Sequence, residues 1–280
     1  MTAITTDSRR GAHRSGRDGR DGRDGYRFGQ VARMEWIKLR SQRGAGWTLA
    51  GTAAAMIALG VLIGIHQSAH LSAAARADYD PTGNGFAGLA FGELAIGVLG
   101  VLLMTSEYSS GLIKATLAAI PNRPLLLAAK AAVFGAVTLA AGELMAFATF
   151  IAMRTSLPAT VPHPGLGQPA VLRAVIMAGA YLALAGLIGL GVGTVIRHTA
   201  GAVGAMVGLL YVVPLALLAL PASVADPVEK FLPMIIAENS LTAVRRVSPS
   251  LPVWAGLGML CLYVAVLLGA GGWLLVRRDA

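Results

Sequence analysis

Six long apolar stretches, separated by short polar segments, dominate the pattern of residues along the chain. A helix of about 20 apolar residues crosses a hydrocarbon core about 30 Å thick. We therefore expect transmembrane helices at about 46–66, 86–106, 130–153, 172–196, 200–221 and 253–276. The composition agrees, because 55% of the residues are hydrophobic and only 13% are charged, well below the charge of a soluble domain. The sequence predicts an all-α integral membrane protein.

An amphipathic segment precedes the first expected span. Its apolar residues share one side of a helical wheel, and basic residues flank that side, which is typical of an interfacial helix in the headgroup plane. The apolar side consists of Phe28, Val31, Ala32, Trp36 and Leu39, and the basic flanks of Arg27, Arg33, Lys38 and Arg40. We expect this helix to contact membrane lipid, with Glu35, Trp36, Lys38 and Arg40 as its candidate functional residues.

Glu35 is the unusual residue of this segment, because the same wheel places its carboxylate within the apolar side. A carboxylate there needs a partner, and Lys38, three residues later, is in reach. Two interpretations stay open. Glu35 is either a solvated charge beside the membrane or a hinge contact between this helix and the cytoplasmic loop that follows the second span.

That loop, residues 107–129, is too patterned to be a simple connector. Leu112 and Ile113, Thr116 and Leu117, and Ile120 recur at helical spacing and predict a short amphipathic helix. Two prolines, Pro121 and Pro124, end the helix.

The order Glu107-Tyr108-x-x-Gly111, a short apolar helix, Pro121-x-Arg123, and then Lys130 resembles the type-2 permease family of ABC transporters. In that family the pattern lies in the cytoplasmic loop between the second and third spans. A second similar piece, Met34 to Ser41, precedes the first span. The resemblance extends over residues 27–280. It implies a permease subunit of an ATP-driven exporter that forms its pathway as a dimer, with a second copy or a homologous permease.

The resemblance also implies that a separate ATPase subunit, which holds ATP and magnesium, docks on loop 107–124. Leu112, Ile113 and Leu117 would then fill a cleft of that subunit, with Lys114 and Arg123 on its rim. Glu107 would anchor the start of the coupling helix, where a negative charge suits the helix dipole. The candidate coupling residues are Glu107, Tyr108, Gly111, Leu112, Ile113, Lys114, Leu117 and Arg123.

The longest expected outer loop contains an apolar run from Phe231 to Ala237 that is too short to cross a membrane. We expect a re-entrant or interfacial helix at about 226–245. By the resemblance, such helices cap the exit of the pathway. A purely structural packing role stays equally open.

Basic residues are distributed unevenly between the loops, and the first helix has the strongest bias. This pattern places both termini in the cytoplasm. The net charge of +9 is explained by that orientation, so no nucleic-acid partner is expected. Residues 1–26, which repeat Gly-Arg-Asp, are expected to form a disordered cytoplasmic tail. The resemblance and the lack of organelle signals imply the inner, or plasma, membrane of a prokaryote.

Two acidic residues, Glu93 and Glu143, fall within the expected spans. Ionisable groups at such depth are costly and are functional candidates by default. They favour an alternative function, an ion-coupled secondary transporter or channel, while protonated glutamates packed between helices are the simpler interpretation. A weaker alternative is a non-transporting assembly or sensor subunit.

The sequence lacks the groups that several chemistries require. It has no Gly-Lys dipeptide and so no phosphate-binding loop, and no metalloprotease or serine-hydrolase motif. We therefore expect neither an ATPase site nor a bound cofactor in this chain. His66 and His70 have metal-ligand spacing, but no convincing third ligand follows, so no metal site is expected.

Overall fold

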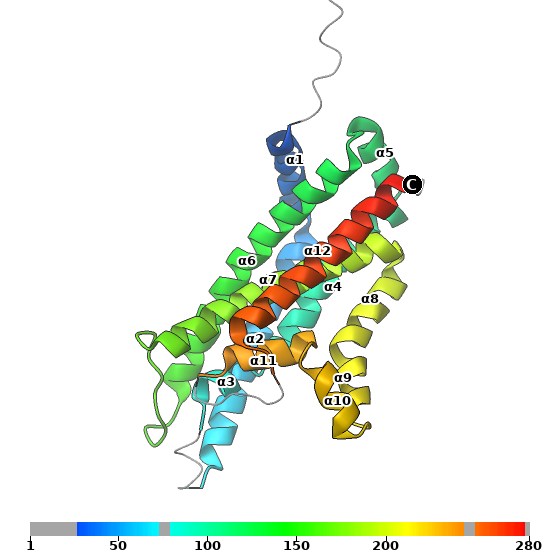
Figure 1. The fold of residues 1–280 in the computed structure, drawn as a ribbon. Coiled ribbons are helices and arrows are strands. Elements are labelled where there is room, and N and C mark those ends of the chain that lie inside the picture. The colour runs from blue at the N-terminus through cyan, green and yellow to red at the C-terminus, as the bar shows by residue number, and fades with distance from the viewer. Residues whose placement is uncertain (1–26, 73–78, 244–249, 278–280) are drawn as a thin grey trace, which may run out of the picture.

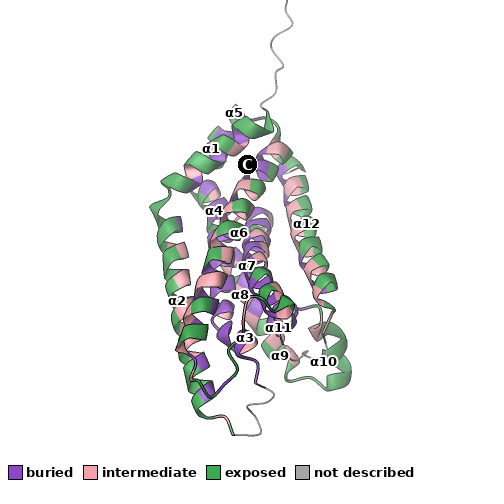
Figure 2. Ribbon diagram, turned by 90° about the vertical axis from the view of Figure 1, so that its left-hand side faces the viewer, coloured by how far each residue is buried: buried purple, intermediate pink, exposed green. Residues whose placement is uncertain are grey.

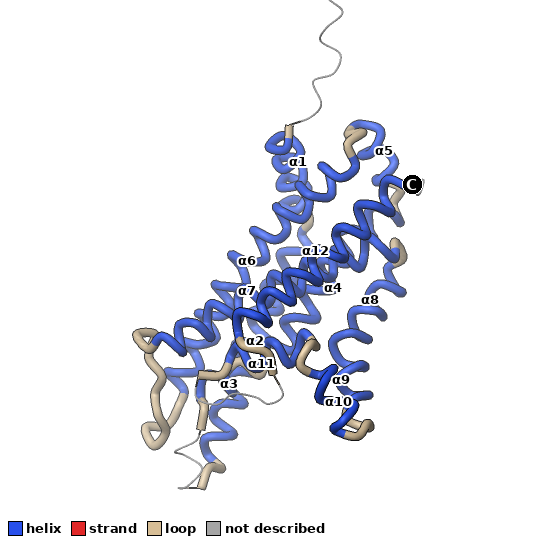
Figure 3. Tube along the Cα trace, in the orientation of Figure 1, coloured by secondary structure: helices blue, strands red, loops and turns tan. Residues whose placement is uncertain are grey.

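The computed structural model describes residues 27–72, 79–243 and 250–277, and the expected tail 1–26 lies outside them. The described residues form helices and loops and contain no strand (Figure 3). Six of these helices are long and apolar enough to cross a membrane. The prediction of an all-α, multi-pass membrane protein is confirmed.

The candidate spans lie close to the positions that the apolar pattern predicts. They are α2 (Arg43–Ala69), α4 (Leu89–Ser109), α6 (Arg123–Ser156), α7 (Pro169–Ile196), the broken helix Thr199–Leu217, and α12 (Val253–Arg277). Five shorter helices connect or precede them: α1 (Phe28–Ser41), α3 (Pro81–Gly85), α5 (Leu112–Ala119), α10 (Ala222–Glu229) and α11 (Pro233–Leu241).

Helix α7 forms the centre of the bundle, with α4 and α6 packed against it (Figure 2). In the most apolar 18-residue stretch of α7, 78% of the residues are buried. In the corresponding stretches of α2, the broken helix and α12, only 17–22% are buried. Glycines allow α4 and α7 to touch closely, since a Cβ at Gly100 would collide with the backbone of Gly186. The three peripheral helices leave most of their apolar surface to lipid or to another chain.

Both ends of the described chain lie at one end of the bundle (Figure 1). We call this the α5 end, because α1, α5, the start of α6 and the last turn of α12 gather there. Helices α3, α10 and α11 lie at the opposite end. An even number of spans requires this arrangement of the two termini.

Helix α6 is longer than the expected third span. It has 34 residues and begins at Arg123, where the Asn122 side chain accepts a hydrogen bond from the backbone N–H of Leu125. At about 1.5 Å per residue the helix is about 51 Å long, well beyond the hydrocarbon core. Its first turns therefore extend past the other spans toward the α5 end, and Lys130 lies within the helix rather than at its start.

The fifth span is broken into α8 (Thr199–Val207), the π-helix η1 (Gly208–Val212) and α9 (Val213–Leu217). Pro214 has no N–H to donate to the preceding turn, which accounts for the wider π-helical turn before it. On this turn the Tyr211 hydroxyl donates a hydrogen bond to the Ala90 carbonyl of α4. The irregular helix is thereby attached to the start of the second span.

The segment expected to be re-entrant, 226–245, forms the end of α10 and all of α11, and its last two residues lie outside the described ones. Helix α11 packs on α7 and α12 and buries Ile236 and Leu241. The segment is therefore a helix that covers the bundle opposite α5, and its depth in the membrane stays a prediction.

Candidate functional site

Two lysines and two glutamates from three helices form a closed ring of ion pairs at the α5 end. The Lys130 ammonium of α6 lies 2.5 Å from Glu35 Oε2 of α1 and 2.8 Å from Glu107 Oε1 in the last turn of α4. Lys38 Nζ of α1 lies 3.1 Å from Glu35 Oε1 and 3.2 Å from Glu107 Oε1. Each lysine contacts both carboxylates, so the ionic ring connects three helices and has no net charge.

Three members of the ionic ring are almost completely buried. Lys130 is 2% exposed, Glu35 3% and Glu107 5%, while Lys38 covers the ring on the solvent side. Burial by itself lowers the pKa of Lys38, but the carboxylates of Glu107 and Glu35 outweigh that effect and hold the pKa above its ordinary value of 10.5. Buried charges of this kind are tolerated only when they are paired and hydrogen-bonded, as they are here.

The ring excludes one of the two interpretations of Glu35. Because Glu35 is buried, it is not a solvated charge beside the membrane. Lys38 is one of its partners, as the spacing predicted, and Lys130 is the second and nearer one. Through the two lysines Glu35 is connected to the end of α4, directly before the loop, and a hinge role there stays a prediction.

Glu107 lies elsewhere than the sequence analysis expected. Helix α5 begins at Leu112 and is preceded by Gly111, whose φ of 71° is a left-handed conformation that glycine adopts without strain. Glu107 lies before that turn, in the last turn of α4, where the helix dipole opposes a negative charge. The expectation that it anchors the start of α5 through the dipole is wrong. Its charge is instead compensated by Lys38 and Lys130.

Helix α5 presents a different face than the resemblance implied. Ile113 is 2% exposed and packs with Leu103 and Met104 of α4, so in this conformation it cannot fill the cleft of a partner. Leu117 is half-buried beside it. Leu112 is 47% exposed and Lys114 is also exposed. The outward surface of α5 is therefore Leu112, Lys114 and the alanines between them and the end of the helix.

Two arginines hold the last turn of α12 at this end. Arg123 Nη1 donates to the Leu275 carbonyl at 2.5 Å, and Arg197 Nη2 donates to the Leu274 carbonyl at 3.0 Å. These carbonyls belong to the end of a helix, where they lack partners within the helix. Arg123 is half-buried, and its place on the rim of a docking surface stays a prediction. The guanidinium of Arg197 also stacks 5.1 Å from the Tyr108 ring.

Lys130 is the member of the ring that the sequence analysis did not select as a site residue. In the resemblance to the permease family it only ends the pattern that begins at Glu107. A stronger signal was present, because apolar residues surround Lys130 on both sides in the sequence. A lysine within such a helix needs a carboxylate partner, because an unpaired charge there costs a large amount of free energy.

Glu93 is buried in the second span in a very different environment. The Tyr181 hydroxyl of α7 donates a hydrogen bond to Glu93 Oε2, and Oε1 is buried without a partner. The side chain is 2% exposed, and the described residues give it no ion pair. Tyr211 of the π-helix is held one turn away on Ala90.

Glu143 does not join Glu93. It is a half-buried residue of α6 whose carboxylate lies against Gly179 of α7, where any larger residue would collide with it. Gly179 and Tyr181 are two residues apart on α7, and a helix turns by about 200° over that interval. The two acids therefore contact opposite sides of α7, and the structure does not bring them into one site.

Comparison with known proteins adds no relative. No protein-family model matches the chain, and no curated protein matches it. Among the described residues, no three His, Cys, Asp or Glu side chains are grouped to hold a metal ion.

Proposed function

We propose that this chain is the membrane-spanning permease subunit of an ATP-driven exporter of the ABC type, in the plasma membrane of a prokaryote. A second copy or a homologous permease completes the translocation pathway, and α5 contacts a separate ATPase subunit that holds ATP and magnesium. The observation that carries the proposal is the ionic ring. It connects α1 and α6 to the end of α4, directly before α5, at a single end of the bundle.

The ring supports a mechanical role for α5. Only the turn at Ser110 and Gly111 separates α5 from α4, and Glu107 in the ring lies just before that turn. A displacement of α5 is therefore passed to the end of α4 and, through Lys130, to α6. Both helices pack on α7 at the centre. A push on α5 would in this way move the central helices together rather than bend one loop.

The distribution of basic residues supports a cytoplasmic location for α5. The α5 end carries Lys114, Arg123, Lys130, Arg197 and Arg277, whereas the opposite end carries Arg154, Arg173 and Lys230 among the described residues. By the positive-inside rule the richer end faces the cytoplasm. An ATPase subunit would meet α5 there.

The decisive experiment changes two neighbouring residues of α5. Leu112→Asp places a charge on the exposed face, where it should prevent co-purification of the ATPase subunit while the chain itself stays folded. Ile113→Asp places the charge inside the chain and should unfold the α5 end. Gly44→Asp adds the same charge in open space at the same end and serves as the control. Normal assembly and export by Leu112→Asp would refute the role of α5.

A second candidate function is supported by Glu93. A buried carboxyl group with one unpartnered oxygen, beside an irregular helix, can serve as a proton or cation site in an ion-coupled secondary transporter or channel. The purified chain alone, reconstituted into vesicles, would then move ions without any ATPase subunit, and Glu93→Gln would stop it. Absence of ion flux in the isolated chain, together with ATP-dependent export by the assembled complex, would eliminate this candidate.

A further inference from the structure

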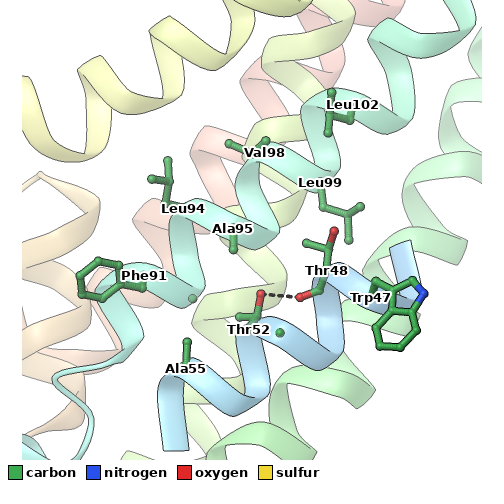
Figure 4. A pocket seen from close by; sticks show the side chains of 12 residues that line it. Trp47, Thr48, Thr52, Ala55, Phe91, Leu94, Ala95, Val98, Leu99 and Leu102 are labelled. Carbon is green, nitrogen blue, oxygen red and sulfur yellow. Dashed lines mark hydrogen bonds between the residues drawn. The ribbon is translucent and has the colours of Figure 1, made fainter. Parts of the chain in front are cut away.

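An open apolar groove lies between α2 and α4 on the outside of the bundle. Its volume is about 500 Å³. Ala95 and Leu99 of α4 point across it toward Thr48 and Thr52 of α2, with Trp47 beyond them at one side (Figure 4). Behind the groove the two helices meet, because Met56 fills the space beside Gly92. The groove therefore opens outward and does not lead into the bundle.

The two threonine hydroxyls in the groove already donate hydrogen bonds and are not available to donate to an occupant. Thr48 Oγ1 donates to the Gly44 carbonyl at 2.9 Å, and Thr52 Oγ1 donates to the Thr48 carbonyl at 2.7 Å. Both bonds lie within α2, so the threonines are satisfied by their own helix. Gly51 leaves the wall between them open, since a Cβ there would meet nothing within 4 Å. An apolar chain fits this surface, and a polar solute does not.

The length of the groove matches one leaflet of a membrane. Its α4 wall extends from Phe91 to Leu102, which is about 16 Å at about 1.5 Å per residue and roughly half of a hydrocarbon core of about 30 Å. A transmembrane helix from another chain would need a groove through both leaflets. An acyl chain of one lipid needs only this half.

Basic residues stand at the end of the groove where the lipid headgroup would lie. Trp47 marks this end, Arg43 lies one turn before it as the first residue of α2, and Arg40 lies in the last turn of α1. Both arginines are exposed, and within residues 27–72, 79–243 and 250–277 the structure records no ion pair or hydrogen bond of their side chains. The nearby acids Glu35 and Glu107 are already paired in the ionic ring. The charge at this end is therefore free to attract an anion.

We propose that the groove binds one acyl chain of an anionic phospholipid, whose phosphate is held by Arg40 and Arg43. The proposal concerns lipid recognition and does not depend on the export function. It is more specific than the general lipid contact expected for α1, because it names a single site with two parts. The apolar wall selects a chain, and the arginines select the headgroup charge.

The test measures which lipid the full chain retains. The protein is equilibrated with equal amounts of phosphatidylglycerol and phosphatidylcholine of identical acyl chains, and bound lipid is counted by native mass spectrometry. Wild type should keep one phosphatidylglycerol with a preference of at least about fivefold, the factor expected from one basic residue at an anionic surface. The double variant Arg40→Gln/Arg43→Gln should still retain one lipid but lose the preference.

Filling the groove tests the acyl chain. Gly51→Leu should remove the retained lipid, whereas Gly258→Leu, at an equally open position on α12, should not. Equal lipid retention by Gly51→Leu and wild type would overturn the proposal, as would equal retention of the two lipids by wild type. A change of oligomeric state in Gly51→Leu with unchanged lipid would assign the groove to a second copy instead.

A second measurement covers the case in which Gly51→Leu does not fold. Phosphatidylglycerol with brominated acyl chains should quench the fluorescence of Trp47, obtained as the difference between wild type and Trp47→Phe. Brominated phosphatidylcholine should quench it less at the same concentration. Identical quenching by the two lipids would again reject an anionic site.

Discussion

Two buried acidic sites in this protein have opposite surroundings. In the ionic ring at the α5 end, Glu35 and Glu107 share two ammonium groups, and three helices contribute. Near the start of α4, Glu93 has one hydrogen bond from Tyr181 and an oxygen without a partner. Both sites are almost fully buried. What differs is whether the protein supplies the compensating charge.

This difference indicates what each site can do. A paired, neutral ring is costly to break, because removal of one partner leaves a buried charge behind. It therefore suits a structural connection that must hold while force passes through it. Glu93 can change its charge without breaking an ion pair, so it suits a site that responds to a proton or cation.

The largest effect is expected from Lys130→Met, which leaves two carboxylates sharing only Lys38. We expect a loss of about 3–5 kcal/mol in the free energy of unfolding, the usual cost of breaking a buried ion pair. Lys114→Met, which changes an exposed lysine of α5, should have almost no effect. Thermal unfolding of the purified variants measures both. Adding Glu107→Gln to Lys130→Met restores the charge balance and should recover part of the loss, and a further loss instead would refute the ring.

A matched pair of substitutions compares the two sites directly. Glu107→Gln should cost about 1–3 kcal/mol, because the amide still accepts a hydrogen bond but no longer balances Lys130. Glu93→Gln should change the stability by less than about 1 kcal/mol, because no cation depends on it and the amide oxygen can still accept from Tyr181. The melting temperatures of the two variants decide the question. Equal losses would mean that the two sites do not differ in kind.

Tyr181→Phe should have a smaller effect of about 1 kcal/mol, through loss of the hydrogen bond to Glu93. The double variant with Glu93→Leu, which removes the acceptor of this bond, measures how strongly the two side chains depend on each other. We expect the two changes to be clearly non-additive, since both act on the same bond. Simple additivity in thermal unfolding would show that the Tyr181 hydroxyl does not serve Glu93.

The smallest effect concerns pH. The pKa of Lys38 is raised above 10.5 by Glu107 and Glu35 against the opposing effect of burial. Because the folded pKa exceeds the unfolded one, the stabilisation is complete below about 10.5 and is lost as the pH rises through the raised value. Unfolding curves of wild type should therefore decline in strongly alkaline solution more than those of Lys38→Met. Parallel curves would show that Lys38 is not paired.

Prediction from the sequence succeeded where the signal is local. The apolar stretches identified all six candidate spans, and the spacing of Ile113, Thr116 and Ile120 identified α5. It failed where side chains from distant segments meet. Glu35 and Lys130 are 95 positions apart, and Lys38 and Glu107 are 69 apart, so no pattern in the sequence could show these two pairings.

The orientation of α5 shows the same limit. Its sequence establishes an amphipathic helix but not which neighbour covers the apolar side. In the structure the side that carries Ile113 packs against other residues of this chain. The hydrogen bond of Arg123 shows this limit too, because its acceptor, the carbonyl of Leu275, is contributed by the last span.

The sequence by itself determined that the chain is an all-helical membrane protein with an amphipathic helix before the first span. Hydrophobicity and helical periodicity are properties of consecutive residues, and each apolar segment is stable in the membrane as a helix by itself. Only the tertiary structure decided that Glu35, Lys38, Glu107 and Lys130 form one neutral ring while Glu93 is left without a cation. That outcome depends on how α1, α4, α6 and α7 pack. Each pairing matters because a charge in a low-dielectric interior is not solvated by water.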